Sequence, residues 1–173
     1  MKKRILQSCG GLLIAAALML GLLAVGGLAL DDEIDTHVES NLSATPQALY
    51  PLLTTQAGLV QWWGEAADRE AVALAGPAEG VGMQVEIRFD GMVFEHWTLT
   101  EAEPGQVRYT IDLQGFILQR TITLTEHNGG TWAIWEDSGV IESPFMRYLT
   151  LLPEDVLLTL PYSALSALDA AAQ

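Results

Sequence analysis

The sequence has few basic residues, and almost all of them lie at one end. Lys2, Lys3 and Arg4 are three of its eight basic residues, and no lysine follows Lys3. From residue 31 onward the chain keeps all 22 acidic residues but only five arginines, so this part has a formal charge of −17. Such a charge repels phosphate backbones and anionic lipid surfaces. We therefore expect no nucleic-acid partner, and we interpret the acidity as favouring solubility.

Cysteine and the motifs of common catalytic sites are also scarce. The single cysteine, Cys9, precedes residue 31, so the rest of the chain has no disulfide and depends on core packing. There is no Gly-x-Ser-x-Gly elbow, no glycine loop of the phosphate-binding type and no metal-ligand spacing among the three histidines. We therefore predict no catalytic residue, no metal and no cofactor.

One long apolar run lies near the N-terminus. Residues 7–30 carry no charge, and as a helix they would extend about 36 Å, enough to cross a hydrocarbon core of about 30 Å. The length favours a retained membrane anchor over residues 1–30, while Gly27-Leu28-Ala29 resembles a signal-peptidase site and leaves a cleaved signal peptide as the alternative.

The basic residues before this run predict the side of the membrane on which the domain lies. The positive-inside rule keeps Lys2, Lys3 and Arg4 in the cytoplasm. We therefore expect a domain over residues 36–173 on the periplasmic or extracellular face, anchored in the membrane or secreted after cleavage. The sequence leaves its oligomeric state open.

The middle of the chain reads as an antiparallel meander. Turn signals such as Asp90-Gly91 and Asn128-Gly129 separate short segments of period two. The predicted strands cover residues 36–42, 71–74, 83–89, 93–101, 107–113, 117–126 and 131–136.

Helical spacing precedes and follows this meander. Residues 46–53 and 58–63 predict two short helices after the first strand. A long terminal helix is predicted from Ser143-Pro144 onward, bent or broken near Pro153 and Pro161.

The order of these elements resembles the SRPBCC superfamily, which includes START domains, polyketide cyclase-like proteins and the birch-pollen-allergen fold. Residues 38–50 (VESNLSATPQALY) resemble its opening strand and helix start, and residues 59–63 (LVQWW) its tryptophan at the end of the second helix. Residues 80–82 (GVG), 101–104 (EAEP) and 129–135 (GGTWAIW) resemble its later turns and glycine-threonine strand. The resemblance implies an α+β helix-grip fold, with an antiparallel sheet of six to seven strands wrapped around the terminal helix.

In this fold the sheet and the terminal helix enclose a cavity, and alternation indicates which side chains face it. The candidate ligand-binding residues are Glu95, Trp97, Tyr109, Arg120, Trp135, Asp137 and Tyr148. A buried Arg120 requires a carboxylate, which predicts pairing with Glu95 or Asp137. Either these charges orient a ligand's head group, or they form a structural ion pair, or a one-residue shift in register places them outside.

Three functions fit these features. The leading hypothesis is binding or transport of a hydrophobic small molecule, such as a lipid, a quinone or a polyketide-like compound, which the aromatic side chains would line. The second is an enzyme of cyclase or dehydratase type that uses Glu95 or Asp137 to move a proton. The third is a protein-interaction module whose cavity is filled by its own side chains.

Overall fold

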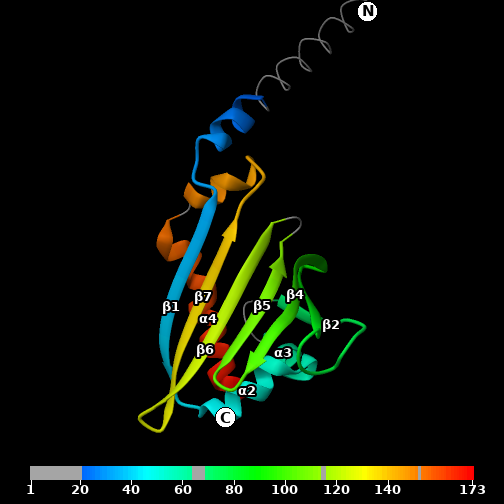
Figure 1. Ribbon diagram of the computed structural model, residues 1–173, viewed down its shortest axis with the longest axis vertical. Coiled ribbons are helices and arrows are strands. Elements are labelled where there is room, and N and C mark those ends of the chain that lie inside the picture. The colour runs from blue at the N-terminus through cyan, green and yellow to red at the C-terminus, as the bar shows by residue number, and fades with distance from the viewer. Residues whose placement is uncertain (1–20, 64–68, 114–115, 152) are drawn as a thin grey trace, which may run out of the picture. The chain divides into compact units, whose positions relative to one another are not determined.

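The computed structural model describes residues 21–63, 69–113, 116–151 and 153–173, drawn in colour in Figure 1. The chain forms two compact units. The larger consists of Glu33–Val140 with Pro153–Gln173, and the smaller of Met1–Asp32 with Ile141–Leu152.

The larger unit contains one seven-stranded antiparallel sheet in the order β1-β7-β6-β5-β4-β3-β2 (Figure 1). Its strands are β1 (Glu33–Leu42), β2 (Arg69–Ala73), β3 (Gln84–Phe89), β4 (Met92–Glu103), β5 (Gln106–Asp112), β6 (Ile117–His127) and β7 (Gly130–Val140). The predicted meander is thereby confirmed. Strands β1 and β7 are longer than predicted because they pair along their whole length, from Glu33 opposite Val140 to Leu42 opposite Thr131.

The two predicted hairpin turns adopt the backbone that their residues favour. Asp90 and Gly91 have φ values of 51° and 76°, and Asn128 and Gly129 have φ values of 52° and 85°. Two successive residues with positive φ are typical of the tight turns whose twist matches that of the flanking strands. These turns fix the register of the strand pairs β3–β4 and β6–β7.

Three helices cover one face and one end of the sheet. The helix α4 (Glu154–Ala171) runs along the sheet, and α2 (Pro46–Thr54) and α3 (Gln56–Trp63) lie together near its C-terminal part (Figure 1). Leu49, Leu53, Leu165 and Leu168 are buried where these helices meet the sheet. A single core therefore lies between the sheet and the helices.

The terminal helix begins later than the sequence predicts. The Ser143-Pro144 pair starts no α-helix; Met146–Leu151 form instead a short 3₁₀ helix, η1, in the smaller unit. The helix α4 starts after Pro153, which has an extended backbone with ψ of 142°. The predicted start was wrong because Pro153 disfavours a helical conformation before it. At Pro161, in contrast, the helix continues.

Most of the predicted membrane segment falls on residues 1–20, which lie outside the described residues. Residues 21–28 are helical, and Leu22, Val25 and Leu28 expose most of their side chains. Within the described part of the chain, no helix combines the length and the apolar character needed to span a bilayer.

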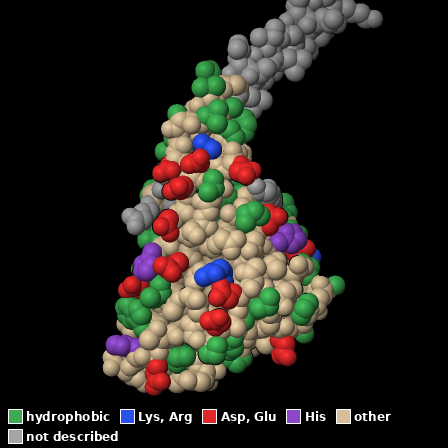
Figure 2. Space-filling view, viewed as in Figure 1, with side chains coloured by type: hydrophobic (Ala, Val, Ile, Leu, Met, Phe, Trp, Pro, Cys, Tyr) green, Lys and Arg blue, Asp and Glu red, His purple; other side chains and the backbone are tan. Residues whose placement is uncertain are grey.

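The surface reflects the acidic composition. Asp and Glu side chains are spread over the face seen in Figure 2, with few Lys or Arg side chains among them. Several of the arginines in the described chain are paired with acids, including Arg88 with Glu86 and Arg108 with Glu101.

Candidate functional site

The candidate site lies on the face of the sheet that is turned toward the helices. The predicted candidates that lie on the strands are all buried, so the register predicted for these strands is confirmed and the one-residue shift is excluded. These buried residues are Glu95, Trp97 and Leu99 on β4, Val107, Tyr109 and Ile111 on β5, Leu118, Arg120 and Ile122 on β6, and Ala133, Trp135 and Asp137 on β7.

Arg120 is the centre of this group. It lies directly opposite Asp137 in the register of β6 and β7. Its Nε donates to Asp137 Oδ1 at 2.6 Å and its Nη2 to Asp137 Oδ2 at 2.8 Å, a bidentate pair. Burial opposes the guanidinium charge, but Asp137 outweighs it, with Glu95 adding to the effect, and the pKa of Arg120 is raised. Arg120 is therefore a buried, permanent cation.

Two indole rings hold the guanidinium of Arg120. Its Cζ lies 4.5 Å from the centre of the Trp97 ring and 4.3 Å from that of Trp135. These distances are within the range of cation–π contacts, which strengthen when water is excluded. Trp135 Nε1 also donates to Asp137 Oδ2 at 3.2 Å. The planar cation is fixed in position by both its ion pair and its aromatic neighbours.

Glu95 is the second buried carboxylate of the site. It accepts a hydrogen bond of 2.6 Å from Trp97 Nε1 on its Oε2. The same oxygen lies 3.8 Å from Arg120 Nη1, and Oε1 lies 3.6 Å from Arg69 Nη1. Both arginine distances exceed that of a hydrogen bond. Glu95 is thus close to two cations without a direct hydrogen bond to either.

Sequence reasoning missed Arg69, because it placed the start of the strand at Ala71. In the structure Arg69 is the first residue of β2, opposite Phe89, and it lies two residues before the buried Ala71 on the same face. If the alternation of inward-facing residues had been continued from Ala71 back to residue 69, Arg69 would have been among the candidates. Its side chain is 17% exposed, so Arg69 connects the buried charges with solvent.

Aromatic rings surround the charged groups. Trp63, at the end of α3, lies 5.0 Å from Trp97 and 6.2 Å from Trp135 between ring centres, and Tyr109 lies 5.1 Å from Trp97. The Tyr109 hydroxyl donates to the carbonyl of Leu53 in α2, and burial raises its pKa far above the usual range. The sheet and helices thus meet through a continuous cluster of rings.

Three buried nitrogen atoms in this cluster have no acceptor within the part of the chain that the structure describes. They are Nη1 of Arg120, Nη1 of Arg69 and Nε1 of Trp63. A buried donor without a partner costs about 1–3 kcal/mol, and native proteins leave few of them. All three lie in the cluster where the sheet meets α3, and the described residues leave their hydrogen-bonding capacity unused.

Tyr148 is placed differently from the other candidates. It belongs to η1 in the smaller unit, where its hydroxyl donates to the carbonyl of Leu23 at 2.9 Å. Tyr148 was chosen as part of a terminal helix starting at Ser143, and in the structure residues 146–151 form η1 instead.

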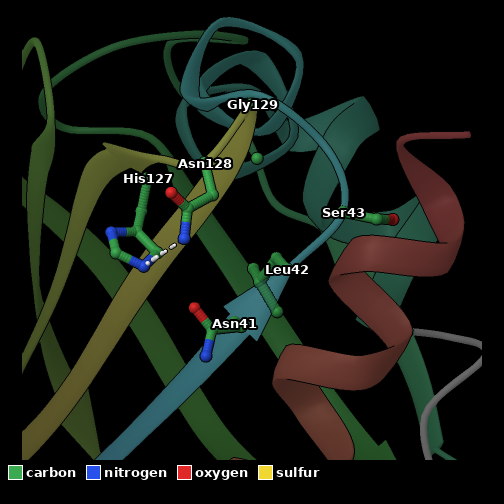
Figure 3. Close-up of a pocket in the computed structure, with 7 residues that line it drawn as sticks. Asn41, Leu42, Ser43, His127, Asn128 and Gly129 are labelled. Atoms are coloured by element: carbon green, nitrogen blue, oxygen red, sulfur yellow. Dashed lines mark hydrogen bonds between the residues drawn. The ribbon is translucent and has the colours of Figure 1, made fainter.

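Two surface hollows contain none of these residues. The larger, of about 460 Å³, lies between the end of β1 and the β6–β7 turn, lined by residues 41–43 and 127–130 (Figure 3). There Asn128 Nδ2 lies 2.8 Å from His127 Nε2 (Figure 3). The other, of about 310 Å³, lies beside Tyr50 and Pro104. His127 is seven residues along β6 from Arg120, or about 23 Å, so the larger hollow is separate from the buried cluster.

The acidic and histidine side chains do not gather into a metal site in the described residues, where no group of three His, Cys, Asp or Glu side chains could hold an ion. His37 lies on the surface between Glu39 and Glu136, at 2.9 and 3.3 Å, and hydrogen bonds to both raise its pKa. His96 lies on the exposed face, 3.8 Å from Glu86.

Together, the antiparallel sheet, the two short helices after its first strand and the terminal helix define a helix-grip α+β domain. No protein-family model matches the sequence, and no curated protein matches it. Several solved structures have the same fold. Protein CV1439 of Chromobacterium violaceum has a TM-score of 0.62 at 19% identity, with 80% of this chain and 96% of that chain covered.

A plant protein and a further bacterial protein are similar at comparable levels. The ginseng major latex-like protein 151 of Panax ginseng has a TM-score of 0.64 at 9% identity, covering 83% of this chain and 99% of its own. The Aha1 dimer from Colwellia psychrerythraea has a TM-score of 0.55 at 20% identity, covering 80% and 96%. These likenesses support the helix-grip, SRPBCC-type fold, and at such identities they show the fold alone.

Proposed function

We propose that this chain binds a hydrophobic small molecule between its sheet and its helices, as a carrier or sensor. The observation that carries this proposal is the group of buried N–H donors on Arg120, Arg69 and Trp63 that find no acceptor among the described residues. A domain that only needed a packed core would gain stability by replacing them with apolar groups. A guest molecule with a polar end offers the missing acceptor.

The surroundings of these donors suit an apolar guest. Trp63, Trp97, Tyr109 and Trp135 contribute large rings to one buried surface. Binding sites for small molecules are mostly apolar and carry a few fixed polar groups that orient the ligand. The latex-like protein of ginseng has the same helix-grip fold.

We further propose that residues 1–30 direct the domain to the outer side of a membrane, as an anchor or as a cleaved signal. The support is the uncharged run at residues 7–30 with its basic start, together with the exposed apolar side chains of Leu22, Val25 and Leu28. Alkaline extraction of membranes and protease treatment of intact cells test this. Retention in the membrane with protease access supports an anchor. Protection from protease in intact and in outer-membrane-permeabilised cells would contradict the orientation.

The binding proposal is tested on the full chain, purified under native conditions in a mild detergent. Native mass spectrometry is expected to detect a retained apolar compound, which extraction then identifies. The exposed-strand variant Thr125→Ala should retain the same compound, whereas Trp97→Ala should lose most of it.

A folded protein that carries no guest and binds none of a panel of apolar probes would overturn the proposal. Circular dichroism checks that the fold is intact. That outcome would favour an interaction module with a filled interior, and turnover of a bound probe would favour an enzyme of the cyclase type.

A further inference from the structure

Exposed hydrophobic side chains gather at one end of the sheet. In the described residues of the larger unit, the large hydrophobic side chains that are exposed elsewhere are those of Val60 on α3, Val81 before β3 and Tyr162 on α4. The remaining ones all lie where β3 and β7 end and where β4 and β6 begin: Phe89, Met92, Phe94, Ile117 and Val140. Because the sheet is antiparallel throughout, these strand ends share one edge of the domain.

The strand register places these side chains in two groups. Phe89 pairs with Met92 across the Asp90-Gly91 turn, and Ile117 pairs with Val140. Met92 exposes 68% of its surface and Val140 55%. The β3–β4 tip and the end of β7 therefore each present apolar side chains to solvent.

The opposite end of the same sheet is polar. Its turns contain Pro104-Gly105 and Asn128-Gly129, and exposed Glu103, Glu126 and His127 lie beside them. Single exposed hydrophobic residues are ordinary, but a group of them at one place marks a contact surface. The difference between the two ends indicates that the apolar end meets an apolar partner.

The course of the chain indicates what that partner is. Strand β1 begins at Glu33, which pairs with Val140, and the uncharged run ends only three residues earlier, at Leu30. Three residues span at most about 10 Å. If residues 7–30 lie in a bilayer, the end of the sheet at Glu33 is therefore held close to the bilayer surface. The row of strands from β1 to β3 is about 24 Å wide, so the β3–β4 tip can reach the same surface.

The charges at this end limit the kind of lipid surface that fits. Three acidic residues, 31–33, precede and begin β1, and Asp90 lies in the β3–β4 turn. An anionic surface would repel these charges, whereas a surface of uncharged or zwitterionic headgroups would not. The apolar side chains would supply the attraction.

We infer that this end of the sheet docks onto a bilayer without net charge, and that Phe89 and Met92 enter the boundary between headgroups and acyl chains. Interfacial segments bury their apolar side chains about 5–10 Å deep in this boundary. The inference rests on the proposed anchoring by residues 1–30, and it names the surface that the anchored domain contacts.

The test measures the depth of a fluorescent label in the bilayer. The full chain, with Cys9→Ala and Met92→Cys, is labelled with nitrobenzoxadiazole and reconstituted into phosphatidylcholine nanodiscs that carry nitroxide-labelled acyl chains. The matched control is Glu103→Cys, at the other end of β4 and about 35 Å away along the strand. We expect the nitroxides to quench the label at position 92 at least about twofold more than the label at position 103, because only the former reaches the acyl chains.

Two further changes probe the cause of the insertion. Phe89→Ser in the chain labelled at position 92 should reduce the quenching, because it removes the apolar neighbour of the label. Replacing half of the phosphatidylcholine by phosphatidylglycerol should also reduce it, because the surface becomes anionic. A label at Ile117→Cys reports on the same end of the sheet if Met92→Cys fails to fold.

The outcomes separate this inference from the proposed anchoring. Co-elution of the chain with the discs, but with equally weak quenching at positions 92 and 103, would overturn the docking while the anchoring stands. Failure to co-elute would overturn both. Cross-linking of two copies through position 92 without quenching by the nitroxides would identify a second copy of the chain as the occupant and would also overturn the docking.

Discussion

Arg120 and Asp137 face each other across β6 and β7 and form a bidentate ion pair, with Nε–Oδ1 at 2.6 Å and Nη2–Oδ2 at 2.8 Å. Both side chains are buried. The carboxylate oxygens use two of the three guanidinium nitrogens, and Nη1 faces Glu95 at 3.8 Å. The Arg120–Asp137 pair thereby fixes the position of Arg120 Nη1, which is one of the three donors that support the proposed function.

Removing one partner of this pair should destabilise the domain strongly. We expect Arg120→Met to lower the free energy of unfolding by about 3–5 kcal/mol, because the Asp137 charge stays buried without its counter-ion. Denaturant titration followed by tryptophan fluorescence measures this. The double variant Arg120→Met with Asp137→Leu should recover most of the loss, and Arg108→Met on the surface should cost less than about 1 kcal/mol. Additive losses in the double variant would contradict the coupling.

The hydroxyl of Tyr109 joins the sheet to α2. Tyr109→Phe should lower the free energy of unfolding by about 1–3 kcal/mol, because the Leu53 carbonyl loses the donor that reaches it from β5. Thermal unfolding by circular dichroism measures the change. Tyr162→Phe is the matched control, since Tyr162 exposes about half of its side chain and should unfold at the wild-type temperature. Equal effects of both changes would show that the Tyr109 contact contributes nothing.

Asp169 joins α4 to the segment after β1. Burial opposes its charge, but hydrogen bonds from the Ala44 amide at 2.9 Å and from Ser43 outweigh this and lower its pKa. The pKa of Asp169 is lower in the folded state than in the unfolded state. Its charge therefore stabilises the fold fully above the unfolded-state pKa, and this stabilisation is lost as the pH falls through the folded-state pKa.

We therefore expect the stability advantage of wild type over Asp169→Asn to be constant from pH 5 to 7 and to shrink below about pH 4. Urea unfolding over this pH range measures it, with the exposed Glu103→Gln as the control. An advantage that persists unchanged to pH 2 would contradict the role of the Asp169 charge.

Gly130 allows β1 and β7 to approach closely. A Cβ at this position would lie 2.3 Å from the Leu42 carbonyl oxygen, which is backbone and cannot rotate away. Gly130→Ala should therefore lower the free energy of unfolding by about 1–3 kcal/mol. Thr125→Ala, at an exposed position of β6, should change it by less than about 0.5 kcal/mol. Chemical denaturation of the two variants compares them, and equal stabilities would show that the strands shift to accommodate the methyl group.

The order of strands and short helices could be predicted because each depends on local signals. The alternation of side chains and the Asp-Gly and Asn-Gly turns act over a few residues, and they fixed the buried face correctly from Glu95 to Asp137. The terminal helix was misplaced, since Ser143-Pro144 is also a local signal but the residues after it form η1 and end at Pro153. Tyr148, chosen as part of that helix, belongs to η1.

By itself, the sequence determined which residues of the sheet point inward and that a buried Arg120 needs a carboxylate partner. Only the tertiary structure decided between Glu95 and Asp137. Asp137, on the neighbouring strand β7, accepts from both Nε and Nη2 of Arg120, whereas Glu95, on β4 two strands away, stays 3.8 Å from Nη1. The tertiary structure also brought in Arg69 from the edge strand and Trp63 from α3. Packing between segments that are distant in the sequence sets these distances. It also buries the three donors that find no acceptor among the described residues.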